Sequence, residues 1–283
     1  MVQTPSAPTR GPLSLRGSYG AVAADYTVEQ RWEEYRFAEH EVWRTLFERQ
    51  SALLGKYAAP EVSAGLGALG IDARQIPRFS AVNDLLGRAT GWRIVAVPGL
   101  IPEEQFFAHL AARRFPVSVW IREPHELDYL SEPDLFHDFY GHVPLLANPV
   151  FAQFMQSYGA AGIKASAHHA VALLARVYWY SVEFGLLSTP DGLRAYGAGI
   201  LSSKGETLYA LESAEPHRVR FDLERVMRTH YQIDAYQRTY FVIDSFEQLF
   251  RASYDTDFGP LYDRIGSQPG IDPHTVLDTD RTI

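Results

Sequence analysis

The sequence predicts a mainly α fold of the α+β class, arranged as a single helical domain with a few short β-strands. Helical periodicity dominates from Pro133 onward, whereas β-type runs are few and short. With 283 residues, 46% of them apolar, the chain is long enough to bury one large core. No internal repeat divides it. We therefore expect a disordered tail at 1–26, a folded domain at 27–265 and an irregular tail at 266–283.

The first half of the chain is predicted to contain one long helix and several shorter elements. Thr27 and Gln30 have the spacing of a capping box before an apolar-periodic run that ends near Gly55. Clusters of Gly and Pro after Gly55 leave room only for short helices. The expected elements are helices at 27–55, at 80–88 and from Pro102, and β-type runs at 92–97 and 116–121.

The second half is expected to be helical apart from one β-type run. Ser245 and Gln248 again have capping-box spacing. No heptad pattern follows Asp255, so nothing predicts a coiled-coil oligomerisation tail. The predicted elements are helices at 134–140, 148–161, 168–184, 204–211 and 222–229, a β-type run at 238–243, and a helix from Ser245.

Composition argues against several classes of partner and site. The formal charge of -8 and the pI of about 5.7 disfavour nucleic acid and anionic membranes, which bind basic surfaces. The chain has no Cys, so any metal site must use His and carboxylates. The first residues lack the apolar stretch of a signal peptide or a spanning helix. A cytoplasmic setting is expected.

His137 and His142 are the first candidates for metal chemistry. Five residues of a regular helix turn by about 500°, which leaves the two side chains about 140° apart. A helix through both residues must therefore be interrupted. Gly141 and Pro144 interrupt a helix easily, so we expect His137 on the last helical turns and His142 just beyond them.

Glu183, near the end of an apolar helical run, is the candidate third ligand. A buried carboxylate needs a cation or hydrogen bonds to compensate its charge, and a metal would supply this. Two imidazoles and one carboxylate suit non-haem iron(II) oxygenases, and they also suit zinc hydrolases. Spacing alone leaves another alternative open, in which Glu183 pairs with an Arg and the two histidines are ordinary and partly buried.

Longer segments around these residues resemble a known family. They are PGL at Gly99, YLSEPDLFHDFYGHVPLL, YWYSVEFGLL and AYGAGILSSKGE, in the order found in pterin-dependent aromatic amino acid hydroxylases. The resemblance covers Trp92 to Phe246 and extends more weakly back to Thr27. It is closest to the bacterial phenylalanine hydroxylases, and it implies that 27–265 is a catalytic domain of this type.

The resemblance implies a site made of three groups of residues. It places iron(II) on His137, His142 and Glu183. The tetrahydropterin cosubstrate, tetrahydrobiopterin or a related molecule, would lie against Gly99, Leu100, Ile101, Phe106, Asp138 and Tyr178. The amino acid substrate would contact Arg122, Pro133, Trp179 and Ser202, with the planar guanidinium of Arg122 holding its carboxylate.

The implied reaction is the hydroxylation of L-phenylalanine to L-tyrosine with O2. Trp179 matches phenylalanine and tyrosine hydroxylases, whereas tryptophan hydroxylases have Phe there. Ile233 stands where tyrosine hydroxylases place Asp. The alternatives are a tryptophan or tyrosine hydroxylase of the same family and, more weakly, a zinc hydrolase using the same triad. The short ends leave room for neither a regulatory domain nor a tetramerisation helix, which implies a monomer.

Overall fold

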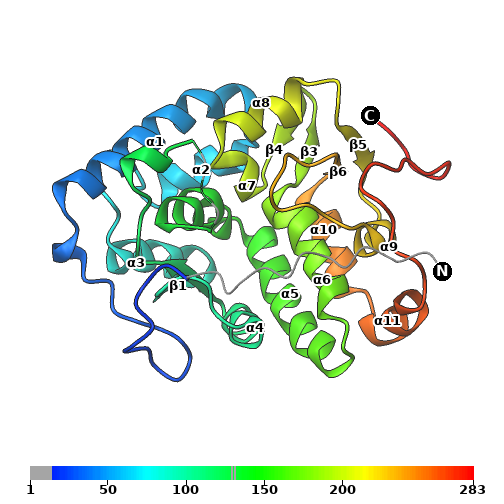
Figure 1. The fold of residues 1–283 in the computed structure, drawn as a ribbon, viewed down its shortest axis with the longest axis horizontal. Coiled ribbons are helices and arrows are strands. Elements are labelled where there is room, and N and C mark those ends of the chain that lie inside the picture. The colour runs from blue at the N-terminus through cyan, green and yellow to red at the C-terminus, as the bar shows by residue number, and fades with distance from the viewer. Residues whose placement is uncertain (1–14, 129, 131) are drawn as a thin grey trace, which may run out of the picture.

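Helices form most of the regular secondary structure, as the sequence predicts. The computed structural model describes residues 15–128, 130 and 132–283. Helix α5 packs against α4, α6 and α10 in the middle of the molecule (Figure 1). Within the described ranges, no helix is both long and apolar enough to cross a membrane. The α-helices are α1 (Phe37–Tyr57), α2 (Pro60–Ala68), α3 (Phe79–Thr90), α4 (Glu103–Ala111), α5 (Pro149–Ala167), α6 (Val171–Tyr178), α7 (Ala198–Leu201), α8 (Lys204–Glu212), α9 (Leu223–Arg228), α10 (Phe246–Tyr254) and α11 (Phe258–Gly266).

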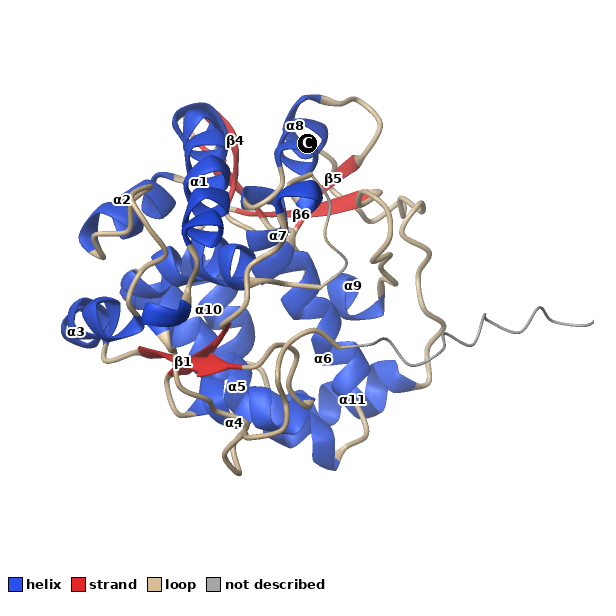
Figure 2. Ribbon diagram, turned by 60° about the vertical axis from the view of Figure 1, so that its left-hand side comes forward, coloured by secondary structure: helices blue, strands red, loops and turns tan. Residues whose placement is uncertain are grey.

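Two small sheets lie on different sides of these helices (Figure 2). In the first sheet, β1 (Arg93–Val97) and β2 (Arg114–Ser118) pair in parallel and are connected through α4. The second sheet has the order β4–β3–β6–β5, in which only the β3–β4 pair is antiparallel. Its strands are β3 (Leu186–Thr189), β4 (Gly192–Ala195), β5 (His217–Arg220) and β6 (Thr239–Ile243).

The β-type runs predicted at 92–97 and 238–243 are confirmed as β1 and β6. The run predicted at 116–121 begins earlier, at Arg114, and ends at Ser118. Strands β3, β4 and β5 were not predicted. Each has four residues, which is too short for an alternating pattern to stand out from a loop.

Helix α1 begins at Phe37, so the predicted start at Thr27 is wrong. The Thr27 hydroxyl donates to Asp25. The Gln30 side chain accepts a hydrogen bond from the backbone N–H of Phe79 at 2.8 Å and donates to the carbonyl of Pro77 at 2.9 Å. The pair therefore does not cap its own segment, and Gln30 instead satisfies a backbone donor at the start of α3.

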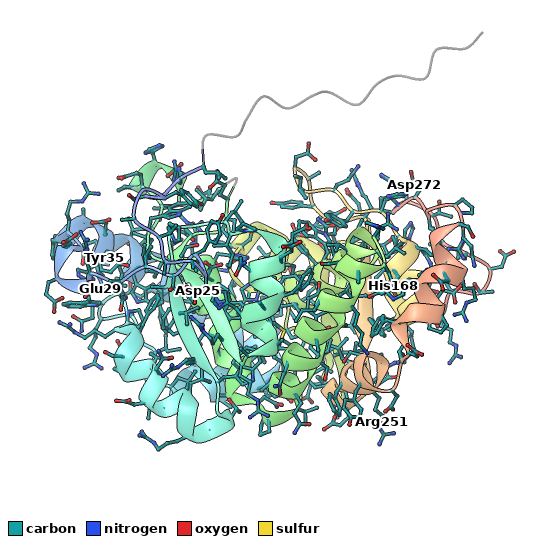
Figure 3. All side chains as sticks on the ribbon, turned by 90° about the horizontal axis from the view of Figure 1, so that it is seen from below. Asp25, Glu29, Tyr35, His168, Arg251 and Asp272 are labelled. Carbon is teal, nitrogen blue, oxygen red and sulfur yellow. The ribbon has the colours of Figure 1, made fainter. Side chains whose placement is uncertain are left out.

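Part of the segment expected to be disordered packs against the domain. Asp25 binds Arg114 of β2 at 2.8 Å and lies beside the first sheet (Figure 3). Arg16 pairs with Glu126, and Tyr19 donates to the carbonyl of Leu100. Residues 1–14 of the expected tail lie outside the described residues. At the other end, residues after α11 form no helix.

Aromatic packing on α1 fixes the segment that carries the two candidate histidines. Trp43 of α1 meets Phe136 and Phe139 edge-on, with ring centroids 5.5 and 5.9 Å apart. Phe136 also stacks on Tyr140 at 4.9 Å. These rings are fully buried. Phe139 and Tyr140, which lie between the histidines, thus face the core together with Phe136.

We predict that Gly65→Ala destabilises the fold. A Cβ atom on Gly65 of α2 would lie 2.1 Å from the carbonyl oxygen of Pro144, in the 3₁₀-helix η4 (Val143–Ala147). The clash should lower the free energy of unfolding by about 1–3 kcal/mol in denaturant titrations. Gly67→Ala in the same helix is the control, because a Cβ there meets nothing within 4 Å. The control should be neutral or stabilising, and equal losses in both variants would contradict the packing argument.

Candidate metal centre

A π-helix brings His137 and His142 to the same side of the chain. The predicted helix at 134–140 widens into the π-helix η3 (His137–His142), in which hydrogen bonds close between residues five apart. The two imidazole centroids are therefore only 5.1 Å apart. The expected interruption between the histidines is wrong, because the helix is widened rather than broken. Gly141 is needed for another reason, since a Cβ there would lie 2.6 Å from the Cβ of Ala198 in α7.

A second π-helix presents Glu183. The predicted helix at 168–184 consists of α6 followed by the π-helix η5 (Trp179–Glu183). Gly197 lies against its end, because a Cβ there would be 2.4 Å from the carbonyl oxygen of Glu183. π-Helical turns are rare and occur frequently at functional sites. Both segments that carry candidate ligands have this form.

The three candidate ligands form one cluster, in which His142 is buried and His137 and Glu183 are partly buried. Nε2 of His137 lies 3.4 Å from one Glu183 carboxylate oxygen, and Nε2 of His142 lies 3.2 Å from the other. One ligand atom from each residue lies within 4.8 Å of the others. Atoms about 2 Å from a common ion lie roughly 3–4 Å from one another, so the spacing fits a metal. Glu183 therefore meets two imidazoles, not the Arg of the alternative interpretation.

The cluster is electrostatically coupled. Burial acts to raise the pKa of Glu183, but the two adjacent imidazoles outweigh it and lower that pKa below its usual range. Burial acts to lower the pKa of His137, but the Glu183 carboxylate outweighs it and raises that pKa. The carboxylate is thus ionised and ready to bind a cation.

Ser202 orients the first ligand. Its hydroxyl lies 2.9 Å from Nδ1 of His137. With Nδ1 as the donor, Nε2 keeps its lone pair for a metal, which is the usual arrangement of a ligating histidine. The family resemblance implies a place for Ser202 beside the substrate, whereas in the structure its hydroxyl contacts the imidazole of His137.

Asp134 connects the metal cluster to Arg122, and the sequence analysis missed it. Its carboxylate is fully buried and accepts two hydrogen bonds from the Arg122 guanidinium, at 2.8 and 2.9 Å. The same carboxylate accepts from the backbone N–H of His137 at 3.0 Å. An Asp three residues before His137 has the spacing of a helix cap, and this signal could have identified it.

A row of aromatic rings leads from the cluster to Phe106. Tyr178 lies 6.0 Å from the His142 ring and meets Phe106 edge-on at 5.5 Å. Asp138 is buried, and its carboxylate accepts from the backbone N–H of Ser118 at 2.8 Å. Burial raises the pKa of Asp138. Three of the residues expected around a pterin thus lie on elements adjoining the metal cluster.

The Gly99 loop is held from outside by the N-terminal segment. A Cβ on Gly99, whose φ is +154°, would lie 2.8 Å from the Tyr19 hydroxyl. Leu100 is 43% exposed, and its carbonyl accepts the Tyr19 hydrogen bond. Ile101 precedes α4, the helix that carries Phe106. Gly99, Leu100 and Ile101 therefore lead directly into the element that supplies this ring.

Trp179 belongs to a hydrogen-bonded network that the sequence analysis missed. Its indole N–H donates to the side chain of Gln237 at 2.9 Å, and its ring stacks on Tyr231 at 4.3 Å. The backbone N–H of Gln237 donates to buried Glu206, which also accepts from the hydroxyl of Tyr240. Nothing in a single sequence marks the Gln and Glu of this network as partners. Pro133 lies half-buried one residue before Asp134.

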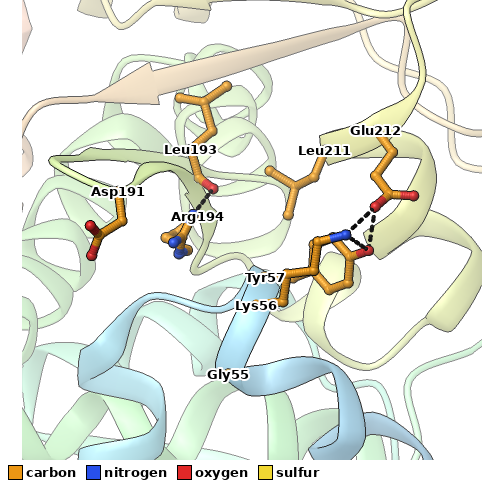
Figure 4. Close-up of a pocket in the computed structure, with 8 residues that line it drawn as sticks. All are labelled: Gly55, Lys56, Tyr57, Asp191, Leu193, Arg194, Leu211 and Glu212. Carbon is orange, nitrogen blue, oxygen red and sulfur yellow. Dashed lines mark hydrogen bonds and ion pairs between the residues drawn. The ribbon is translucent and has the colours of Figure 1, made fainter.

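A surface hollow elsewhere contains none of the expected site residues. It is lined by Lys56, Tyr57, Arg194 and Glu212 among others (Figure 4). Lys56 and Tyr57 both bind the carboxylate of Glu212. The polar groups of Lys56, Tyr57 and Glu212 therefore bind one another. We take the histidine and glutamate cluster, not this hollow, as the candidate site.

Two imidazoles and one carboxylate beside an aromatic row, in a mainly helical domain, match the donor set of the non-haem iron oxygenases with a facial triad. Comparison with known families makes the class specific. The model of the biopterin-dependent aromatic amino acid hydroxylases matches residues 14–254, and the chain belongs to this family.

Characterised relatives are similar along most of their length. The chain is 52% identical to a phenylalanine-4-hydroxylase of Ralstonia nicotianae, over 99% of this chain and 94% of that protein. It is 58% identical to the phenylalanine-4-hydroxylase of Chromobacterium violaceum, over 85% and 80% respectively. The iron- and phenylalanine-bound crystal structure of the C. violaceum enzyme matches with a TM-score of 0.88 and 52% identity, over 92% of this chain and 95% of that one.

We predict that Glu206→Gln removes a pH dependence of stability. Burial raises the pKa of Glu206 from 4.5 to about 7, against opposing hydrogen bonds from Tyr240 and Gln237. Between these values the folded state holds a proton that the unfolded state has lost. Stability is therefore full below pH 4.5 and falls as pH rises towards 7, by at most roughly 3 kcal/mol.

Denaturant titrations of both proteins at about pH 5 and about pH 8 measure this effect. The variant should gain stability relative to the native chain as pH rises. A difference between the two proteins that stays constant across this window would contradict the prediction.

Proposed function

We propose that this chain is a non-haem iron(II), tetrahydropterin-dependent monooxygenase that converts L-phenylalanine to L-tyrosine with O2. The observation that carries the proposal is the cluster of His137, His142 and Glu183, whose donor set and spacing suit iron(II) with open coordination positions. The iron- and phenylalanine-bound relative supports both the metal and the substrate. The match to a biopterin-dependent family supports a pterin cosubstrate.

Different residues of the chain bind the substrate and orient the metal ligands. Arg122, fixed by Asp134, holds the substrate carboxylate through its free edge. Trp179 and Pro133 bound the space for the aromatic ring. Ser202 holds His137 in the tautomer that binds a metal. Each group is held by a partner before substrate arrives, which lowers the cost of ordering the complex.

The pterin is assigned to the aromatic row. Phe106 offers a face for stacking on a flat heterocycle, and Tyr178 stands between Phe106 and His142. Gly99, Leu100, Ile101 and Asp138 complete this proposed contact set. When bound, iron(II) and the pterin supply the electrons that O2 needs in order to react with a closed-shell ring. The rings of Phe106, Tyr178 and Trp179, which are partly buried, limit access of water.

The finer assignments rest on the same residues. Trp179 and Ile233 favour phenylalanine over tryptophan and tyrosine as the substrate. We further propose that the chain works as a monomer in the cytoplasm with tetrahydrobiopterin or a related pterin. The competing reactions are hydroxylation of tryptophan or tyrosine at the same site and hydrolysis by a zinc-loaded triad.

Chelation is predicted to abolish tyrosine formation, and iron(II) with tetrahydropterin and O2 to restore it, whereas Zn²⁺ should not.

His137→Ala should lose at least about 100-fold in kcat, because it removes a ligand and the partner of Ser202. His168→Ala is the control, since that imidazole lies against Tyr262 of α11 in a different part of the molecule (Figure 3). Turnover with Zn²⁺, or an unchanged rate in His137→Ala, would refute the proposal.

Arg122→Lys is predicted to raise the KM for L-phenylalanine by about 10- to 100-fold with a smaller effect on kcat. Lysine keeps the charge but loses the planar fork that binds both Asp134 and a carboxylate, which removes roughly 1.5–3 kcal/mol of charged hydrogen bonding. Steady-state kinetics measure the effect. Arg114→Lys makes the same change at the Asp25 pair and should leave KM unchanged. Equal KM values for the two variants would argue against carboxylate binding by Arg122.

A further inference from the structure

We infer that Gln237 is a positioning residue that fixes the orientation of the Trp179 indole and thereby helps to set which aromatic amino acid the enzyme accepts. The inference rests on the proposed function, because it takes Trp179 as a wall of the substrate-ring pocket. Gln237 itself is assigned no contact with substrate, pterin or metal.

The Gln237 side chain is buried and uses both ends of its amide. It is 3% exposed. Its oxygen accepts from the indole N–H of Trp179 at 2.9 Å, and its nitrogen donates to the carbonyls of Gln232 at 2.9 Å and Ala235 at 3.3 Å. A buried amide with its hydrogen-bonding groups satisfied has one favourable orientation. Gln237 therefore fixes the indole relative to the 232–235 loop.

The hydrogen bond supplies a restraint that packing alone does not. The Trp179 ring stacks on Tyr231 with an interplanar angle of 16°, and it contacts Phe184 at 4.9 Å. Stacking holds the plane of a ring but tolerates sliding and rotation within that plane. The N–H···O bond removes this freedom, because it anchors one edge of the indole. The opposite edge is thereby fixed as well.

A second set of contacts anchors the backbone of Gln237. Its backbone N–H donates to Glu206 of α8 at 3.3 Å. The residue preceding α8 is Ser203, whose hydroxyl accepts from the Glu206 backbone N–H. Its neighbour Ser202 binds Nδ1 of His137. The short segment 202–206 therefore contacts both the candidate metal ligand His137 and Gln237, which binds the indole. The positions of the indole and of the metal site thus depend on the same segment.

Ring size is the property that this arrangement would control. A phenyl ring is smaller than an indole, and an apolar pocket discriminates between them only as far as its walls hold their position. If Trp179 were free to shift within its plane, the pocket would admit a larger ring and hold a phenyl ring less well. Gln237 should then affect substrate preference more strongly than it affects the rate of the chemical step.

The test is Gln237→Met, which keeps length and volume but removes the acceptor. The KM for L-phenylalanine should rise about fivefold or more with little change in kcat. The ratio of kcat/KM for L-tryptophan to that for L-phenylalanine should also rise about fivefold or more. Gln156→Met is the matched control, because Gln156 also links two segments through its amide, to Arg113 and Ala111. It should lower stability without changing the ratio.

A double-mutant cycle separates positioning from general destabilisation. Trp179→Phe removes the indole N–H, so adding Gln237→Met to it should change the substrate ratio by less than about twofold. If the Met variant does not fold, Gln237→Leu removes the same acceptor and should shift the substrate ratio in the same direction. A native ratio in Gln237→Met or in Gln237→Leu, or a full additive effect in the double variant, would overturn the inference.

These outcomes are distinct from failure of the proposed function. If the native chain, loaded with iron(II) and supplied with tetrahydropterin and O2, forms no tyrosine, the function itself is wrong. If the native chain is active and the variants behave as the control does, only the role of Gln237 is wrong.

Discussion

The widening of two helices into π-helical turns is the constraint on which the site depends. A regular helix would leave His137 and His142 about 140° apart, whereas η3 places them on one side. A second π-turn, η5, ends at Glu183. Such turns are less favourable than α-helical ones, so they persist where surrounding packing requires them. The rings of Phe136, Phe139 and Tyr140 against Trp43 and Phe47 of α1 provide this packing.

Asp134 extends this constraint from the metal cluster to substrate recognition. Its carboxylate binds the backbone N–H of His137 and the guanidinium of Arg122 together. A fully buried carboxylate is stable only when such partners satisfy it. Movement of the arginine would therefore disturb the start of η3. The group proposed to hold the substrate carboxylate is thus tied to the turn that carries the candidate metal ligand His137.

The sequence singles out the three candidate ligands but does not encode the geometry that unites them. The fold class and most helices follow from periodicity, and the family resemblance located the cluster. Helix type does not follow, because the π-turns arise from tertiary packing, not from local preference. Thr27 and Gln30 show the same limit. The pair has capping-box spacing, but Gln30 binds the backbone of Phe79 in another helix and does not cap a helix of its own segment. The contacts of Gln237 join residues far apart in the chain, which no local pattern encodes.

The donor set by itself does not select a reaction, because two imidazoles and one carboxylate suit zinc as well as iron(II). What distinguishes this chain lies around the triad. The row from His142 through Tyr178 to Phe106 offers flat apolar faces beside the metal, which suit a heterocycle and not a hydrolytic water. On another side, Trp179 is held by a stack and a hydrogen bond. The chemistry is therefore specified less by the donor set than by the aromatic rings around it, of which Trp179 lies in η5 and Tyr178 and Phe106 lie in α6 and α4.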